Sequence, residues 1–253
     1  MNNHLATQMY TLRSLTLLLP QVLAAVADAG YSGIETFGPL QPAAADLKAQ
    51  LDAQGLRCVS AHVGLDTLES ELDAVAEYHR TLGNDVLVAP WLAPEQRPSD
   101  VPGWQALGRR LDALGERCRR LGMRLLYHNH DFEMVILDGR HAIEWMADAA
   151  SPENLGLEFD AGWVVAGGGD PLALLEEYAG RCPRLHAKET FAAHVPVAEQ
   201  EAGDVGEGLV AWNEVLEAAR KAGVEWVVAE HDSPADPLLS IQRSATYLLP
   251  KWR

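Results

Sequence analysis

The 253-residue chain is poor in basic residues and lacks a long uninterrupted apolar run. Its 20 Lys and Arg residues stand against 36 Asp and Glu residues, which gives a formal net charge of −16. Such a chain repels phosphodiester backbones and anionic membrane surfaces, because nonspecific nucleic-acid binding depends on basic side chains that neutralise phosphates. We therefore expect neither a nucleic acid nor a membrane among its partners.

Cysteine is equally sparse. The three residues Cys58, Cys118 and Cys182 are widely spaced and form no CxxC motif. An odd number of isolated cysteines indicates reduced, buried thiols rather than a disulfide framework. The apolar run that begins at Leu15 is interrupted by Pro20 and is too short to span a bilayer. The beginning of the chain also lacks a basic region followed by an apolar core, so we expect a cytoplasmic protein.

Hydrophobic residues make up 48% of the chain, and they recur in a repeated order of helix, glycine and strand. Segments with helical periodicity, such as LPQVLAAVADAG, end on a glycine, and an apolar β-rich run follows. Glycine suits a helix end because the left-handed conformation there costs it no Cβ clash. The glycines in this position are Gly30, Gly55, Gly83, Gly122 and Gly223.

This repeat predicts eight strands that alternate with eight helices. The strands are expected near residues 5–10, 33–37, 57–62, 86–91, 124–130, 155–160, 184–188 and 226–230. The helices are expected near residues 18–29, 42–53, 68–82, 103–121, 140–149, 171–180, 211–222 and 238–248. Eight such units without a linker predict an α/β fold, a single (β/α)8 TIM barrel over residues 1–253. A doubly wound open sheet is the alternative, although the first turn lacks the glycines typical of it.

Polar residues stand at the carboxyl ends of nearly all these strands. They are Gln8, Tyr10, Glu35, His62, Trp91, His128, His130, Asp160, His186, Lys188 and Glu230. The carboxyl ends of barrel strands carry the active site, so we expect these side chains to share one pocket. Carboxylate and imidazole donors without a thiolate favour a hard or borderline divalent ion.

Five segments resemble the xylose-isomerase-like sugar isomerase/epimerase superfamily in their order and spacing. They are YHNHDFEM at 127–134, LGLEFDAGWVVAGGGDP at 155–171, RLHAKE at 184–189, GEGLVAW at 206–212 and WVVAEHD at 226–232. The resemblance covers nearly the whole chain and implies a barrel with one divalent metal ion. Mn²⁺ is the ion we expect first, with Mg²⁺, Co²⁺ and Zn²⁺ as alternatives. Because inosose dehydratase has the same fold, the resemblance leaves the reaction open.

The resemblance also implies a ligand set for the metal. Asp160, His186 and Glu230 match the ligands that the family places on strands six, seven and eight. In sugar epimerases the fourth ligand is a glutamate of strand five, whereas here His128 stands at the matching position and Glu133 follows five residues later. We expect Glu133 to be the ligand, with His128 as the alternative.

Other residues are expected to bind the substrate or transfer protons. Side chains alternate along a strand, so Lys188 should face the same way as His186, where it holds a substrate oxygen or forms an ion pair. Trp163 stands where epimerases often have a histidine, and it either walls a sugar ring or packs in the core. The remaining expected substrate contacts are Tyr10, Glu35 and His62. Four further histidines are expected on the surface, namely His4, His79, His141 and His194.

A divalent ion that chelates a ketone and a neighbouring hydroxyl acidifies the C–H bond between them by stabilising the enediolate. His128, His130, Glu230 and Lys188 are the expected catalytic residues, because acid–base catalysis needs such groups near that carbon. Return of the proton would make the protein an isomerase or epimerase of a sugar, keto-sugar or polyol. Expulsion of a β-hydroxyl would make it a lyase, such as a keto-sugar or inosose dehydratase, and this is the alternative. The sequence gives no signal for an oligomer.

Overall fold

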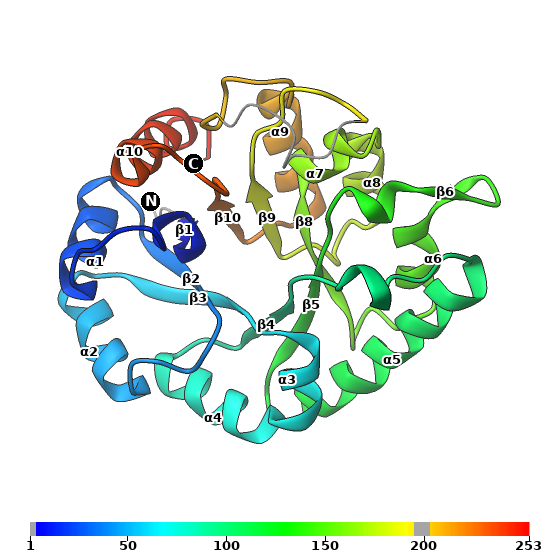
Figure 1. Ribbon diagram of the computed structural model, residues 1–253, viewed down its shortest axis with the longest axis horizontal. Coiled ribbons are helices and arrows are strands. Elements are labelled where there is room, and N and C mark those ends of the chain that lie inside the picture. The colour runs from blue at the N-terminus through cyan, green and yellow to red at the C-terminus, as the bar shows by residue number, and fades with distance from the viewer. Residues whose placement is uncertain (1–3, 195–202, 253) are drawn as a thin grey trace.

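Eight parallel strands close into a barrel in the computed structural model, which describes residues 4–194 and 203–252. Their order around the barrel is β1-β10-β9-β8-β5-β4-β3-β2, so the first strand pairs with the last. Figure 1 shows these strands at the centre, surrounded by helices. The strands are β1 Leu5–Gln8, β2 Gly33–Phe37, β3 Arg57–His62, β4 Val86–Ala89, β5 Arg124–His128, β8 Gly156–Asp160, β9 Arg184–Ala187 and β10 Trp226–Ala229. The predicted TIM barrel is confirmed, and the open sheet is excluded.

Helices follow the strands and cover the barrel. They are α1 Leu19–Asp28, α2 Ala44–Ala53, α3 Leu65–Ser70, α4 Leu72–Leu82, α5 Val101–Arg120, α6 Ala142–Asp148, α7 Ala161–Ala166, α8 Pro171–Glu177, α9 Trp212–Ala222 and α10 Pro237–Leu248. Short elements complete the chain, namely the 3-10 turns η1 Met9–Leu12, η2 Pro94–Gln96 and η3 Phe132–Met134 and the hairpin strands β6 Ile136–Leu137 and β7 Arg140–His141. The sequence did not predict α7, η1 to η3 or this hairpin.

The helices form where apolar residues recur at helical spacing. In α9, Trp212, Leu216 and Ala219 are buried against the barrel, and a buried Leu side chain contributes about 1.5–3 kcal/mol. Gly223 ends this helix in the left-handed conformation, with a φ of 84°. The helix expected at 68–82 is instead two helices, because the backbone at Glu71 leaves the helical region at φ −128° and ψ 23°.

Several strands end earlier than predicted. β1 stops at Gln8, whose side chain accepts a hydrogen bond from the Tyr10 N–H and thereby starts η1. β5 stops at His128, so His130 lies in the loop beyond it. All three cysteines are buried and free. Within the described ranges, no helix has both the length and the apolar character needed to cross a membrane.

The expectation of a surface position for His79 is wrong. This residue lies on α4 and is only 2% exposed. Its Nδ1 atom lies 3.4 Å from Nδ2 of Asn84, which identifies Nδ1 as the acceptor. Burial lowers the pKa of His79 to about 4. The sequence could not separate this case from a solvated one, because a histidine on the inner face of an amphipathic helix follows the same spacing.

Candidate metal and active site

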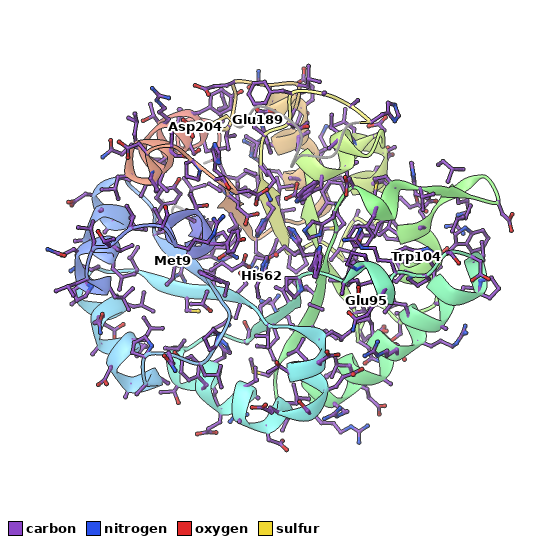
Figure 2. All side chains as sticks on the ribbon, viewed as in Figure 1. Met9, His62, Glu95, Trp104, Glu189 and Asp204 are labelled. Carbon is purple, nitrogen blue, oxygen red and sulfur yellow. The ribbon has the colours of Figure 1, made fainter. Side chains whose placement is uncertain are left out.

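The carboxyl ends of the strands open on a cavity of about 490 Å³. Figure 2 places His62, one of its lining residues, near the centre of the barrel. The lining residues are Tyr10, Phe37, Gly38, His62, Gly64, Pro90, Trp91, His128, His130, Lys188, Glu230 and Asp232. Seven of the residues expected to share one pocket therefore line this cavity, although they lie up to 220 residues apart in the sequence (Tyr10 to Glu230).

Four side chains at this end of the barrel form a group that can hold a metal ion, and two of them, His128 and Glu230, line the cavity. They are His128, Asp160, His186 and Glu230, and one donor atom of each lies within 4.8 Å of the others. Nδ1 of His186 lies 3.3 Å from Oε2 of Glu230 and 3.9 Å from Oδ2 of Asp160. We call these four residues the ligand set.

The spacing within the ligand set suits donors arranged around an ion. Metal–ligand bonds of about 2.0–2.2 Å separate neighbouring donors by roughly 3 Å or more, and Nε2 of His128 lies 4.0 Å from Oδ2 of Asp160. This carboxylate oxygen is buried and has no hydrogen-bond partner among the described residues. A buried carboxylate oxygen without a partner is costly, and a divalent cation would remove that cost.

Glu133, our expected fourth ligand, lies outside this group. Its Oε1 atom accepts a hydrogen bond from the Tyr127 hydroxyl at 2.6 Å, and Oε2 accepts one from the His130 N–H at 2.8 Å. Both oxygens are thus engaged in fixing the loop that follows β5. His128 completes the group instead, because this residue ends β5 and lies with Asp160, His186 and Glu230, whereas Glu133 lies in η3.

A second layer of polar residues lies directly beneath the ligand set. Oε1 of Glu35 lies 2.8 Å from Nε2 of His186 and accepts a hydrogen bond from Gln8 at 2.6 Å. Nε2 of His62 lies 2.5 Å from Oε2 of Glu158. These contacts are short enough to be hydrogen bonds, so we interpret the layer as a hydrogen-bonded support.

The second layer differs from the expectations drawn from the sequence in two respects. Glu35, expected to bind substrate, is fully buried and does not line the cavity. Glu158 was not expected at all, and it too is fully buried. Strand alternation would have found Glu158, because it lies two residues before Asp160 on β8 and must face the same side.

The carboxylates of this layer oppose the effect of burial on the pKa values of the imidazoles that they contact. Burial alone lowers the pKa of His186, but the charges of Glu158 and Glu35 raise it well above the usual value. The same two carboxylates outweigh burial and raise the pKa of His62 to about 10. In the ligand set, burial raises the pKa of Asp160 to about 7.

Lys188 places a positive charge at the wall of the cavity. Its Nζ atom lies 2.9 Å from Oε2 of Glu230 and 2.8 Å from Oδ1 of Asp232. Burial opposes the charged form, but Glu230 and Asp232 raise the pKa of Lys188 above its usual value. The ammonium also lies 4.8 Å from the centre of the Trp163 ring, which is 9% exposed and packs beside His130.

The residues after β5 divide between the cavity and the barrel wall. His130 lines the cavity, and its Nδ1 atom has no hydrogen-bond partner among the described residues. Asn129 turns the other way, as strand alternation predicts. Its side chain donates to the Asp160 carbonyl at 3.1 Å and accepts from the Asp160 N–H at 2.9 Å. Asn129 therefore continues the pairing of β5 with β8 and fixes the backbone of a ligand.

Comparison with known proteins agrees with this architecture. The family model described as xylose isomerase-like TIM barrel matches residues 23–250. The chain is 28% identical to the rhizopine catabolism protein MocC of Rhizobium meliloti over 245 residues, which cover 84% of this chain and 74% of that protein. It is 29% identical to the inosose dehydratase of Geobacillus kaustophilus over 191 residues, which cover 67% of this chain and 61% of that enzyme.

Solved structures show the same fold. A sugar phosphate isomerase/epimerase from Parabacteroides distasonis matches with a TM-score of 0.82 and 22% identity over 98% of this chain and 94% of that one. The IolI protein with a bound zinc atom matches with a TM-score of 0.76 and 16% identity over 99% of this chain and 98% of that one. With the family model matched over most of the sequence, the chain belongs to the xylose isomerase-like TIM barrel family.

Proposed function

We propose that this protein is a divalent-metal-dependent dehydratase of a keto-sugar or keto-polyol. The observation that carries the proposal is the ligand set beside a cavity whose wall holds the imidazole of His130 and a buried cation, Lys188. When bound, the metal supplies positive charge beside the ketone oxygen of the substrate, which acidifies the neighbouring C–H bond. The chain's own residues then move the proton.

His130 is the group we assign to proton transfer. Its imidazole, which lines the cavity, accepts the proton from the carbon next to the ketone, and the electron pair of that C–H bond becomes the new C=C bond. The bond from the β-carbon to its hydroxyl breaks, and the imidazolium returns its proton to the departing oxygen, which leaves as water. Lys188 stabilises the oxygen on which negative charge develops, because its ammonium is fixed by Glu230 and Asp232 before the reaction begins.

The composition of the ligand set favours dehydration over epimerisation. In the sugar epimerases that this sequence resembles, two metal-bound glutamates act as the pair of bases, whereas here an imidazole, His128, takes one of the two positions. One group, His130, can then both take the proton and return it to the departing hydroxyl. The similarity to an inosose dehydratase also supports this assignment.

A metal-dependent isomerase or epimerase is the second candidate. The observation in its favour is that His130 and Glu230 both line the cavity from segments that follow β5 and β10, two strands that are not neighbours. Two bases on different walls are the arrangement that removes a proton from one face of a carbon and returns it to the other.

We further propose that the substrate carries no phosphate. Among the described residues that line the cavity, Lys188 is the one Lys or Arg side chain, and two carboxylates already pair with it. A phosphate group in proteins is normally met by arginine forks, unpaired lysines or a helix N-terminus. An uncharged ring of the inosose or keto-hexose type is therefore the reacting unit that we favour.

The test is an exchange experiment in D₂O with added Mn²⁺, in which the purified protein meets inososes and keto-hexoses and NMR follows the products. We expect deuterium at the carbon next to the ketone together with an unsaturated ketone that has lost water. Formation of an epimer or aldose without water loss would instead establish the second candidate. If the wild type and Asp160→Ala both failed to exchange deuterium with every substrate, both candidate functions would be rejected.

A further inference from the structure

The cavity has a second wall that the proposed reaction does not use. Tyr10, Phe37 and Trp91 line it, and they are 37%, 37% and 46% exposed. The described part of the chain has no other aromatic residue among its exposed large hydrophobic side chains. Exposed aromatic rings that gather in one cavity mark a binding surface, because a soluble protein rarely groups such rings in contact with water without a ligand to cover them.

These rings come from neighbouring parts of the barrel. Tyr10 lies in η1 after β1, Phe37 ends β2, and Trp91 follows β4. The cavity residues between them are small or rigid, namely Gly38, Gly64 and Pro90. The wall therefore consists of aromatic rings with small or rigid residues between them. The cavity residues of the proposed chemistry lie elsewhere, on β5, β9 and β10 and the segments that follow them.

Each of the three rings contacts another side chain of the protein before any ligand arrives. The guanidinium carbon of Arg13 lies 3.6 Å from the centre of the Tyr10 ring, and the Phe37 ring meets Tyr10 edge-on at 5.2 Å. The guanidinium of Arg97 lies 5.5 Å from the centre of the Trp91 ring. Cation–π and edge contacts of this kind reduce the freedom that the rings would lose on binding, and preorganisation raises affinity.

We propose that this aromatic wall is a subsite for a second ring of the substrate, so that the natural substrate is a glycoside-like compound rather than a free keto-sugar. The proposal deepens the function proposed above and rests on it for the position of the keto ring. The flat apolar face of a pyranose or aryl ring stacks on tyrosine and tryptophan, while the polar wall holds the reacting ring. A free monosaccharide would leave the aromatic wall uncovered.

Binding of simple glycosides tests the subsite without requiring turnover. Phenyl β-D-glucopyranoside carries an aromatic ring beyond the sugar, whereas methyl β-D-glucopyranoside carries only a methyl group there. Cellobiose carries a second sugar ring in that place. We expect calorimetric titration of the Mn²⁺-loaded protein to show about tenfold tighter binding of the phenyl glycoside, cellobiose or both than of the methyl glycoside. Equal affinity for all three would overturn the proposal.

Variants of Trp91 test whether the aromatic wall causes this preference for a second ring. Trp91→Ala should reduce the preference to about twofold or less, and Trp91→Phe should restore part of it. Ile136→Ala is the matched control, because Ile136 is 57% exposed and lies on β6 away from the cavity lining. A preference that survives in Trp91→Ala would refute the assignment. Failure of the deuterium-exchange test with this ring preference intact would reject the dehydratase and leave the subsite standing.

Discussion

The Nε2 atom of His186 lies 2.8 Å from Oε1 of Glu35, at the end of a hydrogen-bond chain that Gln8 continues. A histidine that donates from one ring nitrogen to a buried carboxylate presents the lone pair of its other nitrogen in a fixed direction. Here that other atom, Nδ1, faces Asp160 and Glu230. Glu35 therefore positions His186, a member of the ligand set, although Glu35 does not line the cavity.

We predict that Glu35→Gln weakens metal binding. The amide keeps the shape of the side chain but removes the charge that orients and polarises His186, and the loss of such a partner costs roughly 10–100-fold in metal affinity. Mn²⁺ titration of metal-free protein measures this affinity directly. Glu189→Gln is the control, since Glu189 is also buried but bonds with Trp212 and loop N–H groups instead. Unchanged Mn²⁺ affinity in Glu35→Gln would contradict the role given to Glu35.

The fourth ligand can be identified with a pair of variants. His128→Ala should lower the metal content of protein purified without chelator, whereas Glu133→Gln should retain it. Glu133→Gln should instead destabilise the fold by about 1–3 kcal/mol, because the amide cannot accept hydrogen bonds at both positions from the Tyr127 hydroxyl and the His130 N–H. Elemental analysis and urea unfolding measure the two effects. The opposite pattern would show that Glu133 rearranges to bind the metal.

Lys188→Met should separate metal binding from chemistry. Removal of the ammonium takes away the charge that stabilises the developing oxyanion, so we expect deuterium exchange to slow by roughly 10²–10³-fold. The metal should remain, because Glu230 loses a competing cation. Lys221→Met is the control, since Lys221 forms an exposed pair with Glu217. An exchange rate within twofold of wild type in Lys188→Met, measured by NMR, would remove Lys188 from the mechanism.

Asn129→Ala should destabilise the backbone around Asp160. Two hydrogen bonds join this side chain to the main chain of Asp160, and both are buried. Their removal leaves two buried backbone groups without partners, which costs about 1–3 kcal/mol for each unsatisfied group. We expect a lower urea midpoint together with an exchange rate that recovers at saturating Mn²⁺. Full loss of exchange in a folded, metal-loaded variant would mean that Asn129 takes part in the chemistry.

His79 should make the fold sensitive to mild acid. Its pKa is about 4 in the folded protein and about 6.5 in an unfolded chain. Between these values the unfolded chain binds more protons, so the stability from neutral His79 is complete above pH 6.5 and declines as the pH falls toward 4. Between pH 7.5 and 5 the loss should be about 2 kcal/mol.

The measurement is the free energy of unfolding in urea at both pH values, for wild type and His79→Gln. The variant should lose less stability than the wild type over this interval, because glutamine does not titrate. His194→Gln is the control, since His194 is exposed. Equal losses in wild type and His79→Gln would show that other groups cause the acid sensitivity.

The sequence by itself determined the barrel and most of the ligand set. Helices that end on glycines such as Gly83 and Gly223, each followed by an apolar strand, leave little choice of fold, because this local order is set by backbone conformation and hydrophobic spacing. Strand ends then bring Asp160, His186 and Glu230 together at one end of the barrel. These features follow from alternation along a strand and from closure of the sheet.

Only the tertiary structure separated His128, which lies with Asp160, His186 and Glu230, from Glu133, and it alone revealed the buried carboxylates that contact this group. Glu133 lies just past the end of β5, where the path of the loop and the positions of Tyr127 and His130 determine which way its carboxylate points. Glu158 and Glu35 meet the same imidazoles across the barrel, at a separation in sequence that no local pattern encodes. Hydrogen-bond partners of buried polar groups are chosen by packing in three dimensions, so periodicity predicts the faces of the strands but not the contacts between them.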